Sequence, residues 1–300
     1  SALGAGDIIA IDTRQGEMRA RIDRIEVTDR LEIEATRVAP EVYVPTALVD
    51  EGQPLRAVAS VGTVAASFLD LPLLTGDEVV HAPHVAATAA RWPGQVAVYG
   101  SADDSAYRLA HLLEAPAIMG LTETELPRAD AGRIDKGAPL VVHLVRGTLE
   151  SVSEQRLLSG ANAMAIGDGQ GGPWEVFQFR DAQLVGPGRW ALGHRLRGQA
   201  GTDGIMADSW PAGATVVLLN DAVEQIDLPT AARGVARHYR IGPAARGYDD
   251  PLYSHSEETF QGVGLRPYRP VHLRAKRVGG DLSISWVRRT RIDGDTWSGW

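Results

Sequence analysis

The sequence contains no cysteine among its 300 residues. This absence excludes disulfide bonds, thiolate metal sites and cysteine nucleophiles. Lysine is nearly absent too, because 28 of the 30 basic residues are arginine and only Lys136 and Lys276 remain. Acidic residues number 38 and the formal charge is −8. We therefore expect no phosphate-neutralising surface over the whole chain and no specific binding of nucleic acid.

Long apolar runs are also missing. The most apolar stretch, residues 58–74, is shorter than the ~20 residues that span a bilayer, and four polar or turn-forming residues interrupt it: Gly62, Ser67, Asp70 and Pro72. The sequence therefore predicts no membrane span. The first residues show no initiator Met and no leader pattern. The last residues, TWSGW, follow a turn signal at Asp293 and Asp295, and the sequence ends in the middle of the strand expected after that turn. We expect a fragment of a longer protein.

The pattern that is present is typical of β structure. Glycine and proline fill 50 of the 300 positions, above the average share of about 12%. Short apolar runs recur between these residues every ~8–12 positions, which is the spacing of β-sandwiches and barrels. No β-α-β rhythm appears. The predicted fold class is mainly β, with several small β-barrel or β-sandwich modules, and any helix is expected within residues 86–113, where strands remain the alternative.

Four parts follow from the breakers and the alternation. Residues 1–50 read as three antiparallel strands with a bulge after Ile22, where the alternation changes phase. Residues 51–140 form a β-rich module with some helix, and residues 141–268 a sandwich or barrel. Residues 269–300 resemble the truncated start of a fibronectin type III sandwich, with Leu282, Ile284 and Trp286 on one face. Trp286 is expected in the core of that sandwich.

The candidate chemical motifs are weak. The glycine-rich run at 167–172 suggests a phosphate loop, but a strand follows it where a helix N-terminus would be needed, so we predict a hairpin tip. His81 and His84 are three apart with no third ligand nearby. The acidic pairs at 103–104, 249–250 and 257–258 would serve a glycosidase only if two carboxylates converged in a cleft. We expect no catalytic residue, no metal ligand and no cofactor.

Four separated strings carry a family resemblance. They are SGAN at 159–162, WEVFQFR at 174–180, LRGQAGT at 196–202, and RPYRP at 266–270 leading to ISWVRRTR at 284–291. In this order they resemble the large tail-tip protein of gene transfer agents and related siphophages, the family called host specificity or megatron protein. The resemblance covers roughly residues 140–300. GDII at 6–9 and RVAPEVY at 37–43 look like the end of the hub domain of that family.

The resemblance implies a structural, non-enzymatic role at the tail tip of a virion assembled in the bacterial cytoplasm. It implies a baseplate hub, as a homotrimer, that closes the tail tube, contributes to host attachment and lets DNA pass. Its partners would be the distal tail ring, further tail-tip modules and a host surface glycan. The family-motif residues are expected to be structural, with Arg197 held by carbonyls or a carboxylate: Trp174, Phe177, Phe179, Arg197, Gly198, Gly201, Thr202, Trp286, Arg288 and Arg289.

A second class of function stays open. A glycan-binding module would use exposed tryptophans as stacking platforms, and the candidates are Trp92, Trp174, Trp190 and Trp210. Burial of these side chains in cores would contradict that hypothesis. A glycan-hydrolysing module would need the two converging carboxylates. The Arg288, Arg289 and Arg291 cluster is predicted to lie on a solvated sheet face rather than to bind an anion, because alternation separates its members.

Overall fold

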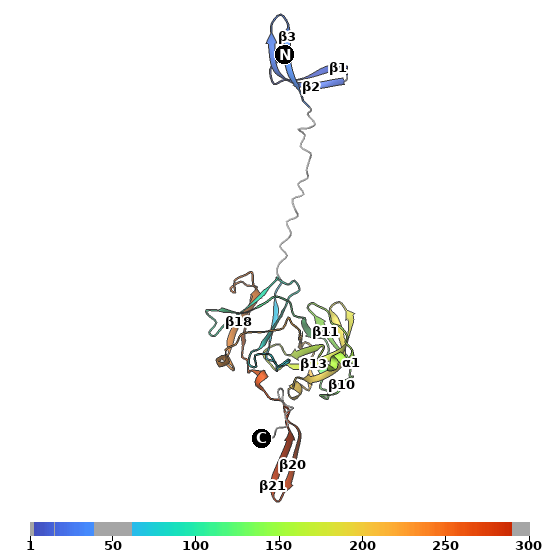
Figure 1. Ribbon diagram of the computed structural model, residues 1–300, viewed down its shortest axis with the longest axis vertical. Helices are drawn as coiled ribbons and strands as arrows, with labels where there is room; N and C mark the ends of the chain where they lie inside the picture. The colour runs from blue at the N-terminus through green and yellow to red at the C-terminus, as the bar shows by residue number, and fades with distance from the viewer. Residues whose placement is uncertain (1–2, 15, 39–61, 290–300) are drawn as a thin grey trace. The chain divides into compact units, whose positions relative to one another are not determined.

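The computed structural model describes residues 3–14, 16–38 and 62–289 and confirms a mainly β protein, with 47% strand and 5% helix (Figure 1). The chain divides into two compact units, Ser1–Ser60 and Val61–Trp300. The boundary predicted at residue 50 and the turn predicted at Asp293 to Asp295 lie outside the described residues. No helix within the described parts of the chain is long and apolar enough to cross a membrane.

The first unit is a three-stranded antiparallel sheet in the order β1-β2-β3, formed by β1 (Ile8–Thr13), β2 (Gly16–Val27) and β3 (Leu31–Arg37). The register between β2 and β3 shifts between Ile22 and Arg24, which confirms the predicted bulge. Ala20 and Ile22 are its buried side chains, whereas Val27 is 77% exposed. A sheet of this size buries little apolar surface by itself.

A six-stranded antiparallel barrel forms one half of the second unit. Its strands are β8 (Met119–Thr122), β11 (Leu140–Leu144), β12 (Ala163–Gly167), β13 (Glu175–Gly186), β14 (Arg189–Gln199) and β16 (Thr215–Leu218). The sheet order β14-β11-β8-β16-β12-β13 closes because β13 also pairs with β14. The short β10 (Ile134–Asp135) adds to β14. The long β13–β14 hairpin can serve two neighbours, and this allows the ring to close.

Apolar alternation fills this barrel. Phe177 and Phe179 are fully buried in a core shared with Leu140, Val142 and Trp190. The glycine-rich run at 167–172 lies at the connection between β12 and β13, residues 168–174, so the predicted hairpin tip is confirmed. The one α-helix among the described residues, α1 (Glu154–Leu158), begins with the Ser153 hydroxyl accepting from the Arg156 N–H. Two short strands, β9 (Leu126–Pro127) and β15 (Ser209–Trp210), pair with each other, and Leu126 and Trp210 contribute to the barrel core.

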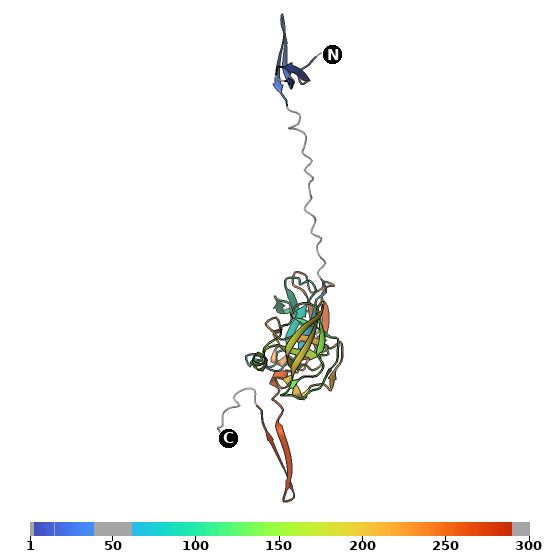
Figure 2. The same ribbon diagram turned by 90° about the vertical axis from the view of Figure 1, so that its right-hand side faces the viewer.

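The other half of the second unit is a pair of small sheets (Figure 2). One has the order β17-β5-β4, formed by β4 (Ala65–Leu69), β5 (His84–Thr88) and β17 (Glu224–Gln225). The other has the order β19-β18-β6-β7, formed by β6 (Val96–Ser101), β7 (Arg108–Leu113), β18 (Arg237–Pro243) and β19 (Ser254–Glu258). Phe68, Val85, Val98, Tyr239 and Ile241 form a core between the two sheets. Short 3-10 turns follow at η2 (Thr202–Gly204), η3 (Thr230–Ala232) and η4 (Val263–Leu265).

The predicted module boundary, the module assigned to strands β17 to β19 and the predicted place of any helix differ from the structure of this unit. The boundary at 140/141 falls inside the barrel, because β8 precedes it and pairs with β11. Strands β17 and β18, assigned to the 141–268 module, pair instead with β5 and β6, and β19 adds to β18 in the same sheet. The segments 86–91 and 101–113, where any helix was expected, contain strands β5 and β7 and a turn. Their amphipathic spacing was too short to distinguish one buried sheet face from a helix face.

The hairpin of β20 (Val271–Val278) and β21 (Asp281–Val287) also differs from expectation. Trp286 is 58% exposed, so its predicted place in a core is wrong for this chain. Leu282 and Ile284 share its face and are 60% and 51% exposed. Two strands make one layer, and no described residue supplies the second layer that would bury this face.

Candidate functional site

A buried ion pair lies where β13 and β14 meet. Arg197 and Glu175 have no exposed side-chain surface, and Nε and Nη2 of Arg197 donate to the two carboxylate oxygens at 2.7 and 2.8 Å. The carboxylate also accepts from Nε1 of Trp210 at 2.7 Å and from the N–H of Gly198 at 3.2 Å. Nη1 of Arg197 donates to the Pro127 carbonyl at 2.5 Å. Carbonyls or a carboxylate were predicted to hold Arg197, and both kinds of partner are present.

The rest of the LRGQAGT string, residues 198–202, ends strand β14 and forms the turn that follows it. Gly198 has φ +61°, and a Cβ there would lie 2.6 Å from Cα of Asp203. Gly201 has φ +81°. The Thr202 hydroxyl accepts from the Val176 N–H at 3.0 Å and donates to the Gln199 carbonyl at 2.7 Å. Only glycine combines the left-handed backbone with the close approach at 198, so this string serves the backbone.

The aromatic string at 174–180 faces two ways. Phe177 and Phe179 point into the barrel core, whereas Trp174 packs against Leu69 and Leu71 outside it. Nε1 of Trp174 donates to the Phe68 carbonyl of β4 at 3.1 Å. Trp174 therefore joins the barrel to the smaller sheets.

The arginine cluster near the C-terminal hairpin is divided. Nη2 of Arg289 donates to Asp203 at 3.1 Å, Nε donates to the Arg269 carbonyl at 3.1 Å, and the guanidinium lies 5.0 Å from the Tyr268 ring. The predicted place on a sheet face is wrong for Arg289, because it lies beyond the end of β21 and pairs with Asp203, although 36% of its side-chain surface is exposed. Arg288 is exposed, and Arg291 lies outside the described residues.

Three of the four proposed tryptophan platforms are buried and not available for stacking on sugars. Trp174, Trp190 and Trp210 are only 2%, 9% and 7% exposed. Trp92 packs against the core of the small sheets, and its Nε1 donates to the carbonyls of Gly94 and Glu114. Burial contradicts a glycan-binding mode that uses Trp174, Trp190 or Trp210, whereas Trp92 is only half-buried.

A cavity of about 690 Å³ lies between the barrel and the loops that flank β4 and β5. Glu78, His84, Gln178, Asn220 and Tyr268 are among the polar side chains that line it. His84 is 7% exposed, burial lowers the pKa of its imidazole, and Nδ1 has no hydrogen-bond partner in the described part of the chain. The cavity has polar walls, but its glutamate is already committed to the backbone.

Glu78 closes its own loop. Its carboxylate accepts from the N–H groups of Leu74, Thr75 and Gly76 at 2.8 to 2.9 Å. Burial raises the pKa of the Glu78 carboxyl, but these backbone donors outweigh burial and lower it to about 2.

This shift predicts a pH dependence. The folded pKa of Glu78 lies below its ordinary 4.5, so its stabilising effect is present above about pH 4.5 and is lost as the pH falls towards 2. We expect Glu78→Gln to flatten the fall in unfolding free energy over that interval, measured by urea denaturation at several pH values. Asp77→Asn, on the neighbouring residue, is the control and should keep the fall. An unchanged profile in Glu78→Gln would contradict this assignment.

A smaller cavity of about 350 Å³ holds Glu258, the second member of one acidic pair. Burial raises the pKa of its carboxyl, and the charge of Asp168 raises it further. Its Oε2 would lie 3.5 Å from a Cβ at Gly171, so the carboxylate abuts the glycine-rich hairpin tip. Asp168 itself accepts from the N–H groups of Gln170 and Gly172 at 2.9 and 3.1 Å. A carboxyl with a raised pKa in a cavity is the type of group that can act as a general acid.

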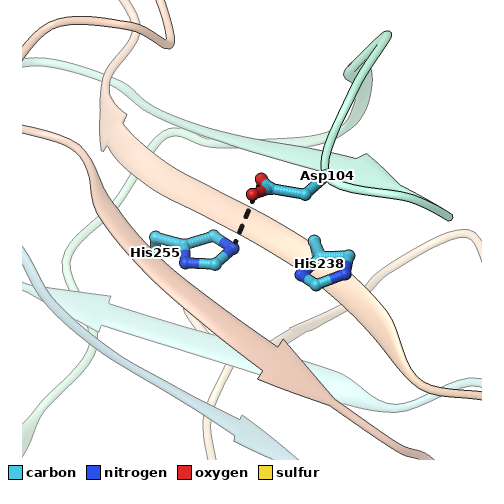
Figure 3. A group of neighbouring side chains, drawn as sticks. All are labelled: Asp104, His238 and His255. Carbon is cyan, nitrogen blue, oxygen red and sulfur yellow. Dashed lines mark ion pairs between the residues drawn. The ribbon is translucent and has the colours of Figure 1, made fainter.

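The outer face of the β18–β19 pair carries a cluster of three side chains of the types that can ligate a metal ion (Figure 3). His238 of β18 and His255 of β19 point to the same side of the sheet, and their rings stack with centroids 5.5 Å apart and an interplanar angle of 11°. Asp104, from the loop between β6 and β7, lies over them. One ligand atom from each of the three lies within 4.8 Å of the others. We call these residues the Asp-His-His cluster.

The loop that carries Asp104 is fixed by its own side chains. The Ser101 hydroxyl donates to Asp103 at 3.1 Å and accepts from the Ser105 N–H at 3.1 Å. Asp104 and Ala106 have φ of 58° and 41°, a left-handed backbone that an alanine rarely adopts. The Tyr107 hydroxyl donates to Asp104, and this bond lowers the pKa of the Asp104 carboxyl.

A second Asp–His pair has a different environment. Asp181 accepts from His194, and Nε of Arg180 donates to the same carboxylate at 2.8 Å. Nη2 of Arg180 also lies 3.0 Å from Nδ1 of His194. Because a guanidinium occupies this position, the pair is a closed ion-pair network, and we assign it no binding role.

The other motif candidates are dispersed. Nε2 of His81 lies 2.9 Å from the Leu228 carbonyl, while His84 lines the large cavity. Asp250 accepts from the Leu252 N–H and lies 3.6 Å from Arg246. The sequence reasoning missed the Asp-His-His cluster because it treated the histidines as single. Strict alternation on β18 and β19 could have put His238 and His255 on one face, but no local signal brings residue 104 to them.

A comparison with protein families bears on the barrel. Residues 117–217, about a third of the chain, match the family described as Rcc01698-like, C-terminal. The match extends from just before β8 to β16 and therefore coincides with the barrel and its buried Glu175–Arg197 pair. No curated protein matches the chain.

Proposed function

We propose that this chain is a structural component of the tail tip of a phage-like particle of the gene transfer agent type. In this role it forms part of a baseplate hub that closes the tail tube and contributes to host attachment and DNA delivery. The observation that carries the proposal is that several of the resembling strings lie in the part of the chain that the family match covers. Two of the resembling strings, at 174–180 and 196–202, build the barrel that the family match covers.

The exposed apolar side chains support an assembled protein. Val27 and Leu31, where β2 turns into β3, are 77% and 58% exposed, and Leu282, Ile284 and Trp286 form an exposed apolar face on β21. Such faces are typical of surfaces that another chain covers. Under the proposal, copies of this chain in a trimeric hub and neighbouring tail proteins cover them.

The proposal is tested on purified particles. We expect peptides of this chain in the particles, and a three-fold density at the distal end of the tail that accommodates the six-stranded barrel, observed by mass spectrometry and electron cryo-microscopy. Particles made after deletion of the coding segment should lack that density. Absence of the chain from purified particles, or a monomer both in the particle and free of it, would contradict the proposal.

Hydrolysis of a cell-wall glycan is a second candidate function, and the raised pKa of the Glu258 carboxyl in its cavity favours it. A glycosidase needs one such acid and a second carboxylate across the substrate. The test compares Glu258→Gln with the matched neighbour substitution Glu257→Gln, measuring particle assembly and cell-wall degradation. If Glu258→Gln alone abolishes degradation while assembly stays normal, the function is enzymatic. Normal degradation in both variants excludes Glu258 as the acid.

A further inference from the structure

We propose that the Asp-His-His cluster, Asp104, His238 and His255, binds one divalent ion of a first-row transition metal, with Zn²⁺ as the primary candidate. The site joins the β6–β7 loop to strands β18 and β19. It is separate from the barrel and does not depend on the proposed tail-tip function.

The spacing of the donor atoms fits such an ion. Two ligands at ~2.1 Å from a tetrahedral zinc are about 3.4 Å apart, and Nε2 of His255 lies 3.6 Å from Oδ1 of Asp104. All three donors lie within 4.8 Å of one another. The remaining contraction requires only side-chain rotation, since Asp104 and His255 have 46% and 43% of their side-chain surface exposed. Solvent can supply the other ligands.

The donor types select the class of metal. Two imidazole nitrogens and one carboxylate oxygen suit Zn²⁺, Ni²⁺ and Co²⁺. Ca²⁺ and Mg²⁺ prefer six or more oxygen ligands and are expected to bind poorly. Nδ1 of His238 is buried and has no hydrogen-bond partner among the described residues, so that ring can adopt the tautomer that a metal requires. The near-parallel rings of the two histidines already place them side by side.

The aspartate is positioned in advance. Its loop is held by the Ser101, Asp103 and Ser105 hydrogen bonds, and the Tyr107 hydroxyl orients the carboxylate. Hydrogen bonds to the ligands are a regular feature of metal sites and tune their affinity. The left-handed backbone at Asp104 is the conformation that brings its side chain over β18.

Charged neighbours set the affinity. Nη2 of Arg240 lies 3.7 Å from the Asp104 carboxylate and its guanidinium stacks on Tyr107 at 4.9 Å, so a cation faces the site from β18. Glu257 on β19 pairs with His238 across the sheet and brings a negative charge to the same face. Because Arg240 repels a bound cation, we expect Arg240→Gln to tighten metal binding. A purely structural cluster would show no such gain.

The test uses the purified 300-residue chain after treatment with a chelator and dialysis. Isothermal titration with ZnSO₄ is expected to show one high-affinity ion per chain, with a weaker response to NiCl₂ and none to MgCl₂. His255→Asn should weaken zinc affinity by at least about tenfold, since even residues behind the ligands are worth 10–100-fold. His272→Asn is the matched control, because His272 lies on the β20–β21 hairpin and outside the cluster.

Each outcome decides the proposal. It is supported if zinc binds once, His255→Asn and Asp104→Asn lose affinity, His272→Asn keeps it and Arg240→Gln gains it. Thermal unfolding gives a second readout, because an ion that binds only the folded chain raises the melting temperature. The proposal is overturned if the unaltered chain takes up no zinc, or if His255→Asn binds as tightly as the unaltered chain. Circular dichroism of each variant confirms that the exposed substitutions leave the fold intact.

Discussion

Arg197→Met is expected to lower the free energy of unfolding of the barrel by about 3–5 kcal/mol, the typical loss when one partner of a buried ion pair is removed. Methionine fills much of the vacated volume, but the Glu175 carboxyl group, which has no exposed surface, loses its cationic partner. Trp210 and the Gly198 N–H still donate to it, and two neutral donors do not replace a guanidinium that gives two charged hydrogen bonds. Urea denaturation followed by tryptophan fluorescence measures the loss.

The matched control is Arg189→Met, in the same strand. Arg189 pairs with Glu123 at 2.6 Å, but 48% of its side-chain surface is exposed, so solvent screens the pair. Exposed pairs contribute less than about 1 kcal/mol. Equal losses in the two variants would show that burial of the Glu175–Arg197 pair does not set its energetic importance.

Gly120→Ala is expected to destabilise the barrel by about 3 kcal/mol or more, at the upper end of overpacking effects. Gly120 lies in β8 between β11 and β16, and a Cβ there would collide with the His143 carbonyl oxygen and lie 2.8 Å from Cα of Leu144. These atoms belong to the backbone of β11, so no side-chain rotation relieves the contact. The strand pair β8–β11 must separate, and its hydrogen bonds weaken.

Gly193→Ala in β14 is the control for the intrinsic effect of replacing a strand glycine. Its backbone does not require a positive φ, and a Cβ there would meet Asp181 at an ordinary 3.5 Å. We expect a change within about 1 kcal/mol of the unaltered protein. Thermal unfolding of both variants, at equal concentration, separates the effect of the steric clash at residue 120 from the intrinsic effect of replacing a strand glycine with alanine. Equal melting temperatures would contradict the packing at Gly120.

Several features could be predicted from the sequence because they depend on neighbours along the chain. Alternation predicts strands, and the phase change after Ile22 predicts the bulge in β2. A strand directly after the glycine-rich run predicts a hairpin tip between β12 and β13. Gly198 and Gly201, which were expected to be structural, have positive φ, a backbone conformation that glycine adopts without steric cost. Each inference uses an interaction that spans a few residues.

Other features were decided only by tertiary contacts. Burial distinguished strand from helix over 86–113, since short apolar runs fit both. The sequence does not show which acidic residue pairs with Arg197. The pairing of β13 with β14 brings Glu175 to it. Trp286 shares an apolar face as predicted, yet that face stays exposed without a second layer.

The division of the second unit into a barrel and two small sheets and the candidate metal site both depend on strand pairing between distant parts of the chain. The sequence by itself determined the mainly β class, the strand-forming runs and the residue types available for binding. It could not determine that β17 pairs with β5 and that β18 pairs with β6, with β19 added beside β18. This pairing brings His238 and His255 close to Asp104. Backbone hydrogen bonds between strands are alike in every sequence, so they do not select which distant strands pair. The pairing of strands more than a hundred residues apart depends instead on how the side chains of the sheet faces pack and on which sheet edges remain unpaired. These contacts are seen only in the tertiary structure.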